Sequence, residues 1–428
     1  MVNELRRTRL FRWHEDYGAR ISPFGEYEMP LWYASAKEEH LSVLNQAGLF
    51  DTSHMDILLV RGQQGKNILQ WCCSRDLEAC LKGNKMPLTP GWSVYTVILN
   101  DLGHVIDDAI ISQLGTDVYL VVVNASMGPK VRDHFIGQNK DLQAEIILLN
   151  DYVAKIDLQG PLSGNILGKI LSEPKQILNP PFPLFSFKGG LDSNSLTPTP
   201  GVALKNNIPL ILSRSGYTGE FGFELFIAVN HLLEAWEMIF EAGQEFNLRP
   251  CGLAARDSLR AGAVLPLSHQ DIGDWPFLNN PWIFALPWNK EVSVFTKDFL
   301  GKDGLLSATN QAFTYPFVGY DLRKVSPEQS CVQSPGGEDI GQVLTCVTDM
   351  GIDWQEKRIF SVASPDKPLD FQPKGLSCGF VKLNKAIPFS KELQLVDRRR
   401  SLKVRLVKDI RPDRTARKHF QDMVNYFK

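Results

Sequence analysis

The most regular hydrophobic pattern of the chain runs from residue 93 to residue 126. Three runs rich in Val, Ile and aromatic residues are separated by short Asp- and Gly-containing segments at residues 101–103 and 115–117. Runs of this composition form strands, and polar segments of this length connect them as tight turns. The pattern predicts an antiparallel meander of three strands.

Other stretches show helical or mixed patterns. Apolar residues recur at helical intervals over residues 37–48, 62–73 and 231–246, whereas residues 209–228 fit a strand, a glycine-punctuated loop and a second strand. Residues 172–207 are rich in Pro, Ser, Gly and Asn, which predicts a long irregular insertion.

The pattern changes towards the C-terminus. From about residue 315 onward, short strands and loops dominate and fit a small β-barrel or sandwich. We therefore expect the α+β fold class, with a mixed α+β region over residues 1–310 and an all-β domain over residues 311–428.

Composition narrows the functional classes. The chain has 428 residues, a formal net charge of -2 and 43% hydrophobic residues, which fits a globular protein and gives no reason to expect a nucleic-acid partner. No apolar run approaches the roughly 20 residues that a membrane helix needs. The Arg-rich N-terminus lacks the apolar stretch of a secretory signal. We expect a cytoplasmic protein without a membrane segment.

Cysteine and histidine patterns exclude several kinds of site. The seven cysteines form no C-x-x-C pair, and no H-E-x-x-H or G-x-S-x-G motif occurs. A disulfide framework, a zinc ribbon and the common nucleophile classes are therefore not expected, and we predict no metal site.

Two carboxylates interrupt the second strand of the predicted meander. Asp107 and Asp108 would point to opposite faces, so at least one of them faces a packed side of the sheet. A desolvated carboxylate needs a partner. Such a residue is either a hydrogen-bonded structural Asp or part of a functional site.

Register arithmetic places partners beside Asp108. A two-residue turn at residues 101–102 puts Tyr95 opposite Asp108, and a three-residue loop at residues 115–117 puts Asn124 opposite it as well. A shorter second loop would pair Asp108 with Val123 instead and break this row. The row could bind a ligand with several nitrogen donors.

A second candidate site follows the glycine-rich stretch at residues 213–224. Glycines at positions 216, 219 and 222 permit close backbone approach, and Glu224 lies in an aromatic strand. Glu224 could contact an amidine-like edge such as that of a pterin, or it could face solvent after a tight turn. Arg256 and Arg260 share one helix face and could bind a carboxylate-bearing tail or form salt bridges.

The chain resembles the T-protein (aminomethyltransferase) family of the glycine cleavage system. The matching segments occur in order along most of the chain, among them residues 47–55 (AGLFDTSHM), 105–108 (VIDD), 122–125 (VVNA), 158–161 (LQGP), 216–224 (GYTGEFGFE) and 251–257 (CGLAARD). The resemblance implies a three-domain cloverleaf, with two α+β domains around a central folate channel and a C-terminal β-barrel.

The resemblance also implies a site and a reaction. The family's tetrahydrofolate contacts fall on Tyr95, Asp108, Asn124, Tyr217, Glu224 and Arg256. Asp108 would be catalytic, because it would orient the folate nitrogens and stabilise positive charge. The implied reaction moves an aminomethyl-derived methylene from the lipoyl arm of a carrier, the H-protein, to tetrahydrofolate and releases ammonia.

Departures from the family pattern leave the donor open. Gly103-His104 and Ser268-His269 replace family residues on the donor side or the periphery. Folate-dependent demethylases of sulfonium, methylamine or methoxy compounds are an alternative. A non-catalytic folate-binding factor of iron–sulfur maintenance is another, although residues 214–220 lack the cysteine of those proteins.

The near-neutral charge is an average over unlike regions. Residues 389–428 contain 12 Lys or Arg and 5 Asp or Glu, and five of these cations cluster on one predicted hairpin, at positions 398, 399, 400, 403 and 405. The hairpin could be a solvated strand face. It could also bind an acidic lipoyl carrier or the polyglutamate tail of folate.

Overall fold

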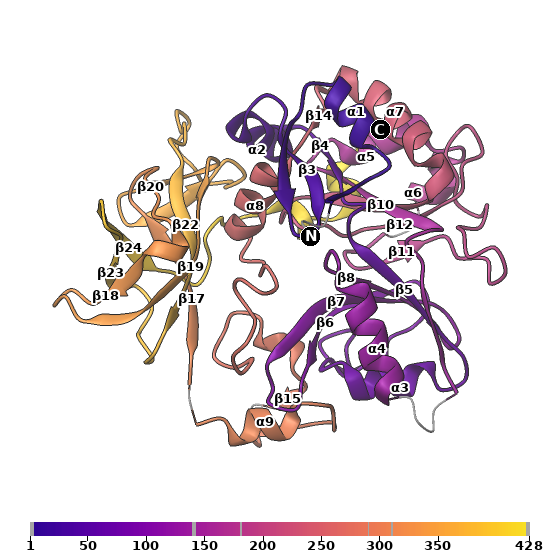
Figure 1. Cartoon of the computed structure of the whole chain (residues 1–428). Helices are drawn as coiled ribbons and strands as arrows, with labels where there is room; N and C mark the ends of the chain where they lie inside the picture. The colour runs from indigo at the N-terminus through magenta and orange to yellow at the C-terminus, as the bar shows by residue number, and fades with distance from the viewer. Residues whose placement is uncertain (1–3, 139–142, 180–181, 290, 310, 425–428) are drawn as a thin grey trace.

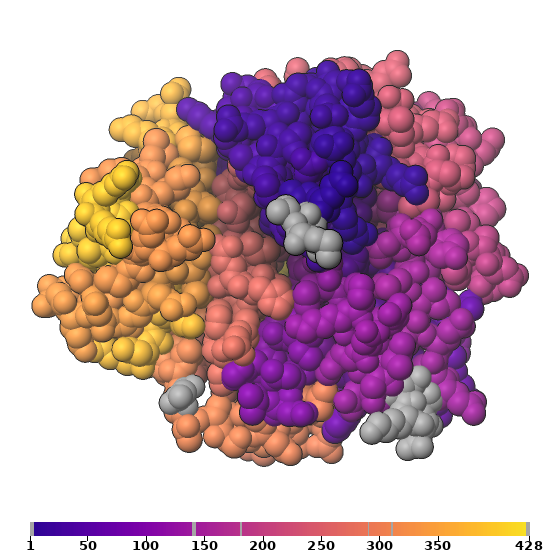
Figure 2. Space-filling view, viewed as in Figure 1, coloured from indigo at the N-terminus to yellow at the C-terminus, as the bar shows by residue number. Residues whose placement is uncertain are grey.

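The computed structural model describes residues 4–138, 143–179, 182–289, 291–309 and 311–424. Three lobes surround a common centre, two of them with mixed sheets and helices and the third an all-β barrel (Figure 1). In the space-filling view the indigo N-terminal segment lies above the purple lobe, and a salmon-coloured segment lies between the purple lobe and the orange barrel (Figure 2). This arrangement confirms the predicted α+β cloverleaf.

The lower lobe is built on the predicted meander. Its antiparallel sheet has the order β6-β7-β8-β5-β9, with β5 Asp56–Arg61, β6 Ser93–Leu99, β7 Val105–Gly115, β8 Val118–Val123 and β9 Glu145–Leu148. Two helices complete the lobe, α3 Gly65–Cys72 and α4 Gly128–Gln138. Ile68 of α3, Val121 of β8 and Phe135 of α4 are fully buried in its core.

The register of the meander differs from the prediction on one side. Asp108 lies opposite Val97 rather than Tyr95, because the turn takes in Gly103 and the ladder is irregular between Ile98 and Leu99. The shift amounts to two residues, so Tyr95 and Asp108 still share a face. The turn is one residue longer than predicted, and the irregularity in the ladder adds one more. Asp108 therefore has a different partner but stays on the same face of the sheet.

The ladder between β7 and β8 keeps the predicted register, although its turn differs from the prediction. Gly115 pairs with Val118, so the turn has two residues rather than three. An irregularity between Gln113 and Gly115 takes up the extra residue, and Ala109 then pairs with Val123. Asn124 follows directly, one residue past the end of β8, beside Asp108.

The upper lobe contains the second sheet. Its strand order is β11-β12-β13-β10-β4-β14, with β4 Gly48–Asp51, β10 Val153–Gln159, β11 Phe187–Lys188, β12 Leu210–Ser213, β13 Gly222–Ala228 and β14 Arg249–Pro250. Three helices belong to this lobe, α5 Ser163–Ile170, α6 Pro174–Leu178 and α7 Leu232–Gly243. The chain passes between the two lobes more than once, so their sequences are interwoven.

The N-terminal elements cover the centre. They are α1 Phe11–Asp16, a small sheet of β1 Arg6–Arg7, β2 Arg20–Phe24 and β3 Tyr27–Trp32, and α2 Ala36–Asn45. Ser35 caps α2 by accepting a hydrogen bond from the backbone N–H of Glu38. Helix α8, Leu253–Gly262, packs against the N-terminal elements β3 and α2 and against the barrel strand β19, Asp339–Asp349. It thereby connects the N-terminal elements to the barrel.

The C-terminal lobe is a closed barrel, not a sandwich. Its strand order is β17-β22-β19-β18-β23-β24, with β17 Phe313–Gly319, β18 Cys331–Gln333, β22 Leu376–Leu383, β23 Glu392–Val396 and β24 Ser401–Leu406. A hairpin of β20 Ile352–Gln355 and β21 Arg358–Ser361 is attached to it. Between the lobes lie β15 Trp288–Asn289, β16 Val294–Phe295 and α9 Lys302–Ser307.

The chain does not end in the barrel. After β24 it returns to the upper lobe and forms α10, Phe420–Met423, where Phe420 and Val424 join the hydrophobic core. The division at residues 310 and 311 stays a prediction. Across the described part of the chain, no helix has the length and apolarity to cross a membrane.

Candidate functional site

Asp108 lies at the end of the meander and is held by two side chains. The Tyr95 hydroxyl donates to Asp108 Oδ2 at 2.9 Å, and Asn124 Nδ2 donates to Asp108 Oδ1 at 2.7 Å. Tyr95 reaches Asp108 diagonally across the ladder, which its long side chain allows. The structure thus brings together all three residues of the predicted row.

Tyr95 keeps part of its surface exposed. It is the only residue of β6 that is not fully buried. Asp108 and Asn124 are half-buried as well. Three polar side chains with accessible surface inside a packed sheet are a place where a ligand could make hydrogen bonds.

Asp107 is a further acid of this site that the sequence analysis did not single out. It is fully buried, and its carboxylate accepts from Asn124 Nδ2 at 2.7 Å and from the Asn124 backbone N–H at 2.9 Å. Asn124 therefore holds both carboxyls at once. The two adjacent aspartates in the sequence were a signal for this second acid. Only the path of the chain after β8, however, places the Asn124 amide beside both carboxylates.

The two adjacent acids both have raised pKa values. Burial raises the pKa of Asp108, and the negative charge of Asp107 raises it further, while the hydrogen bonds from Asn124 and Tyr95 oppose this rise. Burial raises the pKa of Asp107 as well. Two neighbouring carboxyls with few cations around them resist carrying two charges. The pair can therefore hold or release a proton near neutral pH.

A second polar cluster lies in the upper lobe around Glu224, the only residue of β13 that is not fully buried. Lys155 Nζ lies 2.5 Å from Glu224 Oε1 and 2.5 Å from Asp157 Oδ1. Ser215 donates to Glu224 Oε2, and Thr52 donates to Asp157 Oδ1 at 2.8 Å. Glu224 is thus neither a bare carboxylate nor a solvent-facing one.

Lys155 and Asp157 were not among the predicted site residues. They share one face of β10 with Gln159, and three polar residues on one face of a buried strand are a signal. Lys155 and Arg256 hold the pKa of Asp157 below its ordinary value against the opposing effect of burial. This cluster therefore keeps fixed charges.

Tyr217 and Arg256 belong to the upper cluster. The Arg256 guanidinium lies 4.7 Å from the centre of the Tyr217 ring, and its NH1 lies 3.1 Å from Asp157 Oδ2. Tyr217 donates its hydroxyl hydrogen to the Pro266 carbonyl. Burial raises the pKa of Tyr217, and the charge of Asp108 adds to the rise. Three of the six predicted site residues thus lie in the lower cluster and three in the upper cluster, and the charge of Asp108 acts on Tyr217.

The glycines before Glu224 serve packing more than backbone freedom. Only Gly219 has a positive φ, +75°. A Cβ at Gly216 or Gly222 would come within 2.6 Å of the Gln159 amide group. That amide donates to the Ser215 and Phe223 carbonyls and accepts from Thr218, so it needs the space.

Arg260 does not share the role of Arg256. It is fully buried, pairs with Asp271, and lies 2.7 Å from Asp257 Oδ1. The salt-bridge interpretation therefore holds for Arg260. The two arginines are on one helix face, but only Arg256 reaches the half-buried polar region.

The basic hairpin is partly neutralised. Lys403 Nζ lies 2.7 Å from Glu392 Oε2, and Arg405 NH2 lies 3.6 Å from Glu392 Oε1. Arg398, Arg399 and Arg400 are exposed at the turn. The hairpin lies on the barrel and contributes no side chain to the polar region around Asp108.

Metal ligands are not gathered in the described residues. No group of three or more His, Cys, Asp or Glu side chains there has the arrangement of a metal site. All seven cysteines are free, and six of them are buried.

Comparison with known proteins gives concordant matches. The family model described as the GCVT N-terminal domain matches residues 10–275. An aminomethyltransferase of Lysinibacillus sphaericus is 33% identical over 347 residues, which cover 81% of this chain and 86% of that protein. One of Symbiobacterium thermophilum is 34% identical over 359 residues, with 81% and 86% coverage.

An archaeal protein and a solved structure extend the comparison. A probable aminomethyltransferase of Pyrococcus furiosus is 32% identical over 365 residues, with 79% and 85% coverage. The crystal structure of the glycine cleavage system aminomethyltransferase T of Bartonella henselae has a TM-score of 0.71 and 23% identity, and covers 94% of this chain and 96% of that one. That likeness shows the fold. By its sequence and its fold, the chain belongs to the aminomethyltransferase family defined by the GCVT N-terminal domain.

Proposed function

We propose that this protein is a one-carbon transferase that uses tetrahydrofolate. It would move an aminomethyl-derived methylene from a lipoyl carrier to the folate and release ammonia. The observation that carries the proposal is the acid pair: Asp108 is half-buried, tied to Tyr95 and Asn124, and adjacent to Asp107. Membership of the aminomethyltransferase family supports it.

The described residues fit a folate. Phenol, amide and carboxylate groups with accessible surface stand in strands that are otherwise buried, and they offer donors and acceptors for a heteroaromatic ring. When bound, tetrahydrofolate supplies the nucleophilic nitrogen that takes up the one-carbon group.

Asp108 is the proposed catalytic residue. A carboxyl whose pKa is raised towards neutrality can hold a proton at Oδ1 or Oδ2 and release it during the reaction. In its ionised form it stabilises positive charge that develops beside it. Asn124 and Tyr95 fix its orientation, and Asp107 sets its protonation through charge repulsion.

The upper cluster binds and orients. Glu224, fixed by Lys155 and Ser215, would accept hydrogen bonds from ring nitrogens. Tyr217 would offer its ring face, and Arg256 would attract a carboxylate-bearing tail. Fixed geometry of this kind supplies much of the rate of a transfer reaction.

The partner in this proposal is an acidic, lipoyl-bearing carrier protein similar to the H-protein, in the cytoplasm. The exposed arginines of the basic hairpin carry charge of the sign that would attract it. Association should then weaken as the salt concentration rises.

A donor comparison tests the proposal. The purified protein is incubated with tetrahydrofolate and either an aminomethyl-lipoyl carrier or a methylated sulfonium, amine or methoxy compound. Formation of 5,10-methylenetetrahydrofolate and ammonia with the carrier alone supports the transferase. Formation of 5-methyltetrahydrofolate from a small donor would replace it with a demethylase. No product with any donor, despite folate binding, would contradict a catalytic role.

A further inference from the structure

The C-terminal segment, residues 409–424, passes behind the candidate site. It leaves the barrel and lies against the upper lobe, where its yellow ribbon runs among other elements (Figure 1). Its neighbour there is the glycine loop, residues 214–221, between β12 and β13. Phe420 packs on Phe221 with ring centres 5.8 Å apart, and Val424 is buried in the same core.

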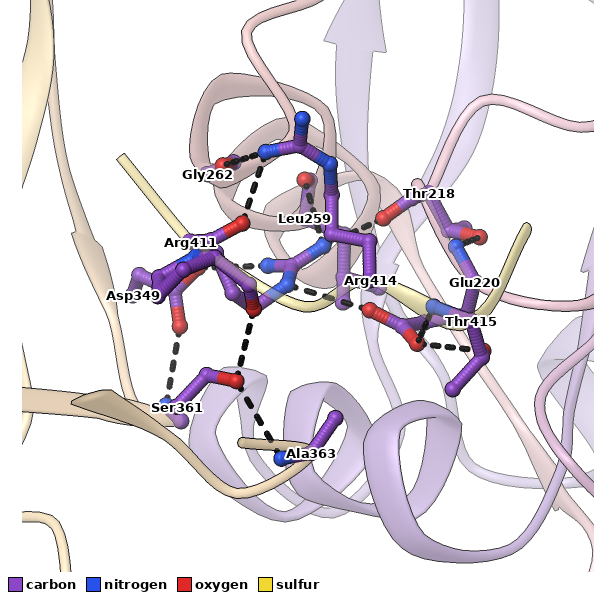
Figure 3. A network of polar contacts seen from close by, with 12 residues as sticks. Thr218, Glu220, Leu259, Gly262, Asp349, Ser361, Ala363, Arg411, Arg414 and Thr415 are labelled. Atoms are coloured by element: carbon purple, nitrogen blue, oxygen red, sulfur yellow. Dashed lines mark hydrogen bonds and ion pairs between the residues drawn. The ribbon is translucent and has the colours of Figure 1, made fainter. Parts of the chain in front are cut away.

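Arg411 is the centre of a buried polar network (Figure 3). Its Nε donates to Glu220 Oε1 at 3.1 Å, and its NH1 donates to Asp349 Oδ2 at 2.5 Å. Its NH2 donates to the carbonyls of Thr218 and of Leu259. One guanidinium thus ties the segment to the glycine loop, to helix α8 and to β19 of the barrel.

Thr415 makes a second connection to the glycine loop (Figure 3). Its hydroxyl donates to Glu220 Oε2 at 2.6 Å and accepts from the Phe221 backbone N–H at 2.8 Å. The Thr415 backbone N–H also donates to Glu220 Oε2, at 3.2 Å. A Cβ at Gly219 would come within 2.6 Å of Arg414 Cδ, so the segment and the loop lie in close contact.

The network leaves the loop little freedom. Glu220, Asp349 and Arg411 are all buried, and Asp349 also contacts His40 Nε2 at 3.0 Å. Arg411 and His40 hold the pKa of Asp349 well below its ordinary value. Buried charges of this kind must keep their partners, because an unpaired charge in the interior is costly. The loop cannot shift without separating them.

Both elements that the segment holds carry candidate site residues. The glycine loop carries Tyr217, and α8 carries Arg256, whose guanidinium stacks on the Tyr217 ring. Arg411 bonds the Leu259 carbonyl and, through its backbone N–H, the Gly262 carbonyl, which are in the last turn of α8. The loop and the helix are therefore fixed relative to each other from behind.

We propose that the C-terminal segment positions Tyr217 and Arg256 for ligand binding, with Arg411 and Thr415 as positioning residues. The effect on the ligand rests on the proposed folate function. The fixing of the loop does not, since it concerns the free protein. The two parts can therefore be measured separately.

The chain offers a matched pair of substitutions. The Thr415 hydroxyl accepts from one backbone N–H and donates to one carboxylate, both on the glycine loop. The Ser364 hydroxyl connects the segment to the barrel side, where it accepts from the Ser361 N–H, lies 3.4 Å from the Ser361 hydroxyl and donates to Asp413 Oδ2 of the segment at 2.6 Å. Thr415→Val and Ser364→Ala thus remove equivalent bonds on opposite sides of one segment.

Two measurements are made on the full-length protein and both variants. Amide hydrogen exchange without ligand should accelerate in residues 214–221 for Thr415→Val and stay at the wild-type rate there for Ser364→Ala. The Kd of tetrahydrofolate should rise about fivefold for Thr415→Val only. Melting temperatures are expected to fall similarly in both variants, so the contrast does not reflect stability.

The outcomes separate the two proposals. Equal exchange of the loop in both variants would overturn the positioning role, whatever the ligand does. Faster exchange with an unchanged Kd would overturn the link to binding. If the wild-type protein binds no tetrahydrofolate while the exchange contrast holds, the folate function fails and the fixing of the loop stands.

Discussion

The two polar clusters of the candidate site shift the pKa values of their aspartates in opposite directions. In the lower lobe, Asp107 and Asp108 are tied to an amide and a phenol, and burial raises both pKa values. In the upper lobe, Lys155 and Arg256 neutralise Asp157 and lower its pKa. The difference shows a division of labour, because an acid pair without a cation can exchange protons, whereas paired charges can only attract and orient.

The largest expected effect is on the proton-exchanging cluster. Asp108→Asn keeps the shape of the side chain but removes its ionisation and replaces one of its two acceptor oxygens with an NH2 donor. We expect transfer to fall by about 10²- to 10⁴-fold while the protein stays folded. Steady-state kinetics and circular dichroism measure the two properties. Turnover close to the wild-type value would remove Asp108 from the catalytic role.

The paired cluster should respond through stability instead. Lys155→Met leaves Asp157 and Glu224 without their shared cation, and we expect a loss of about 3–5 kcal/mol in the free energy of unfolding. Urea denaturation measures it. The control is Lys403→Met on the exposed pair with Glu392, which should change stability by less than about 1 kcal/mol. Equal losses would mean that burial does not distinguish these pairs.

The pH dependence of stability sharpens the same contrast. The pKa of Asp108 is raised from 3.8 to about 7, so the folded state binds more protons than the unfolded state between these values. The contribution of Asp108 to the free energy of unfolding should therefore fall as the pH rises through this range, by at most about 1.4 kcal/mol per pH unit. Asp157, with a lowered pKa, should instead contribute stability that is lost as the pH falls below its ordinary value.

The same pH series on Asp108→Asn identifies the source. The variant should lose the part of the fall in stability between about pH 4 and pH 7 that Asp108 contributes, while Asp107, whose pKa burial also raises, keeps its own part. Unfolding free energies from urea titrations at several pH values give the slope. The same slope in the variant and the wild type would assign the effect to other groups.

The smallest expected effect concerns His269. This residue has a φ of +63°, and its Nε2 lies 4.0 Å from Asp107 Oδ1. His269→Gly should raise the free energy of unfolding by about 1 kcal/mol, because glycine adopts this backbone conformation without strain. His269→Ala is the control, since it removes the imidazole but keeps the strain. A gain of equal size in both variants would locate the effect in the side chain.

Much of this could be read from residue order, with identifiable errors. The meander strands and helices α2, α3 and α7 followed from hydrophobic periodicity, whereas α6 and β11 lie within residues 172–207, which were predicted to be irregular. The Tyr95–Asp108–Asn124 group followed from alternation even though both turn lengths were wrong. Between β6 and β7 the error in register is two residues, which preserves the face of the strand. Between β7 and β8 an irregularity in the ladder compensates for the wrong turn length. Asp107 was set aside because alternation puts it on the opposite face from Asp108.

The sequence by itself determined which residues form strands and helices, which faces are apolar and which carboxylates interrupt them, because these depend on neighbours a few positions away. Only the tertiary structure decided which carboxylates receive a cation. Lys155 and Glu224 are 69 positions apart, and Arg411 and Glu220 are 191 apart. Charge neutralisation depends on distance in space and on burial, and neither can be read from local spacing. The same residue type therefore has a raised pKa at Asp108 and a lowered pKa at Asp157.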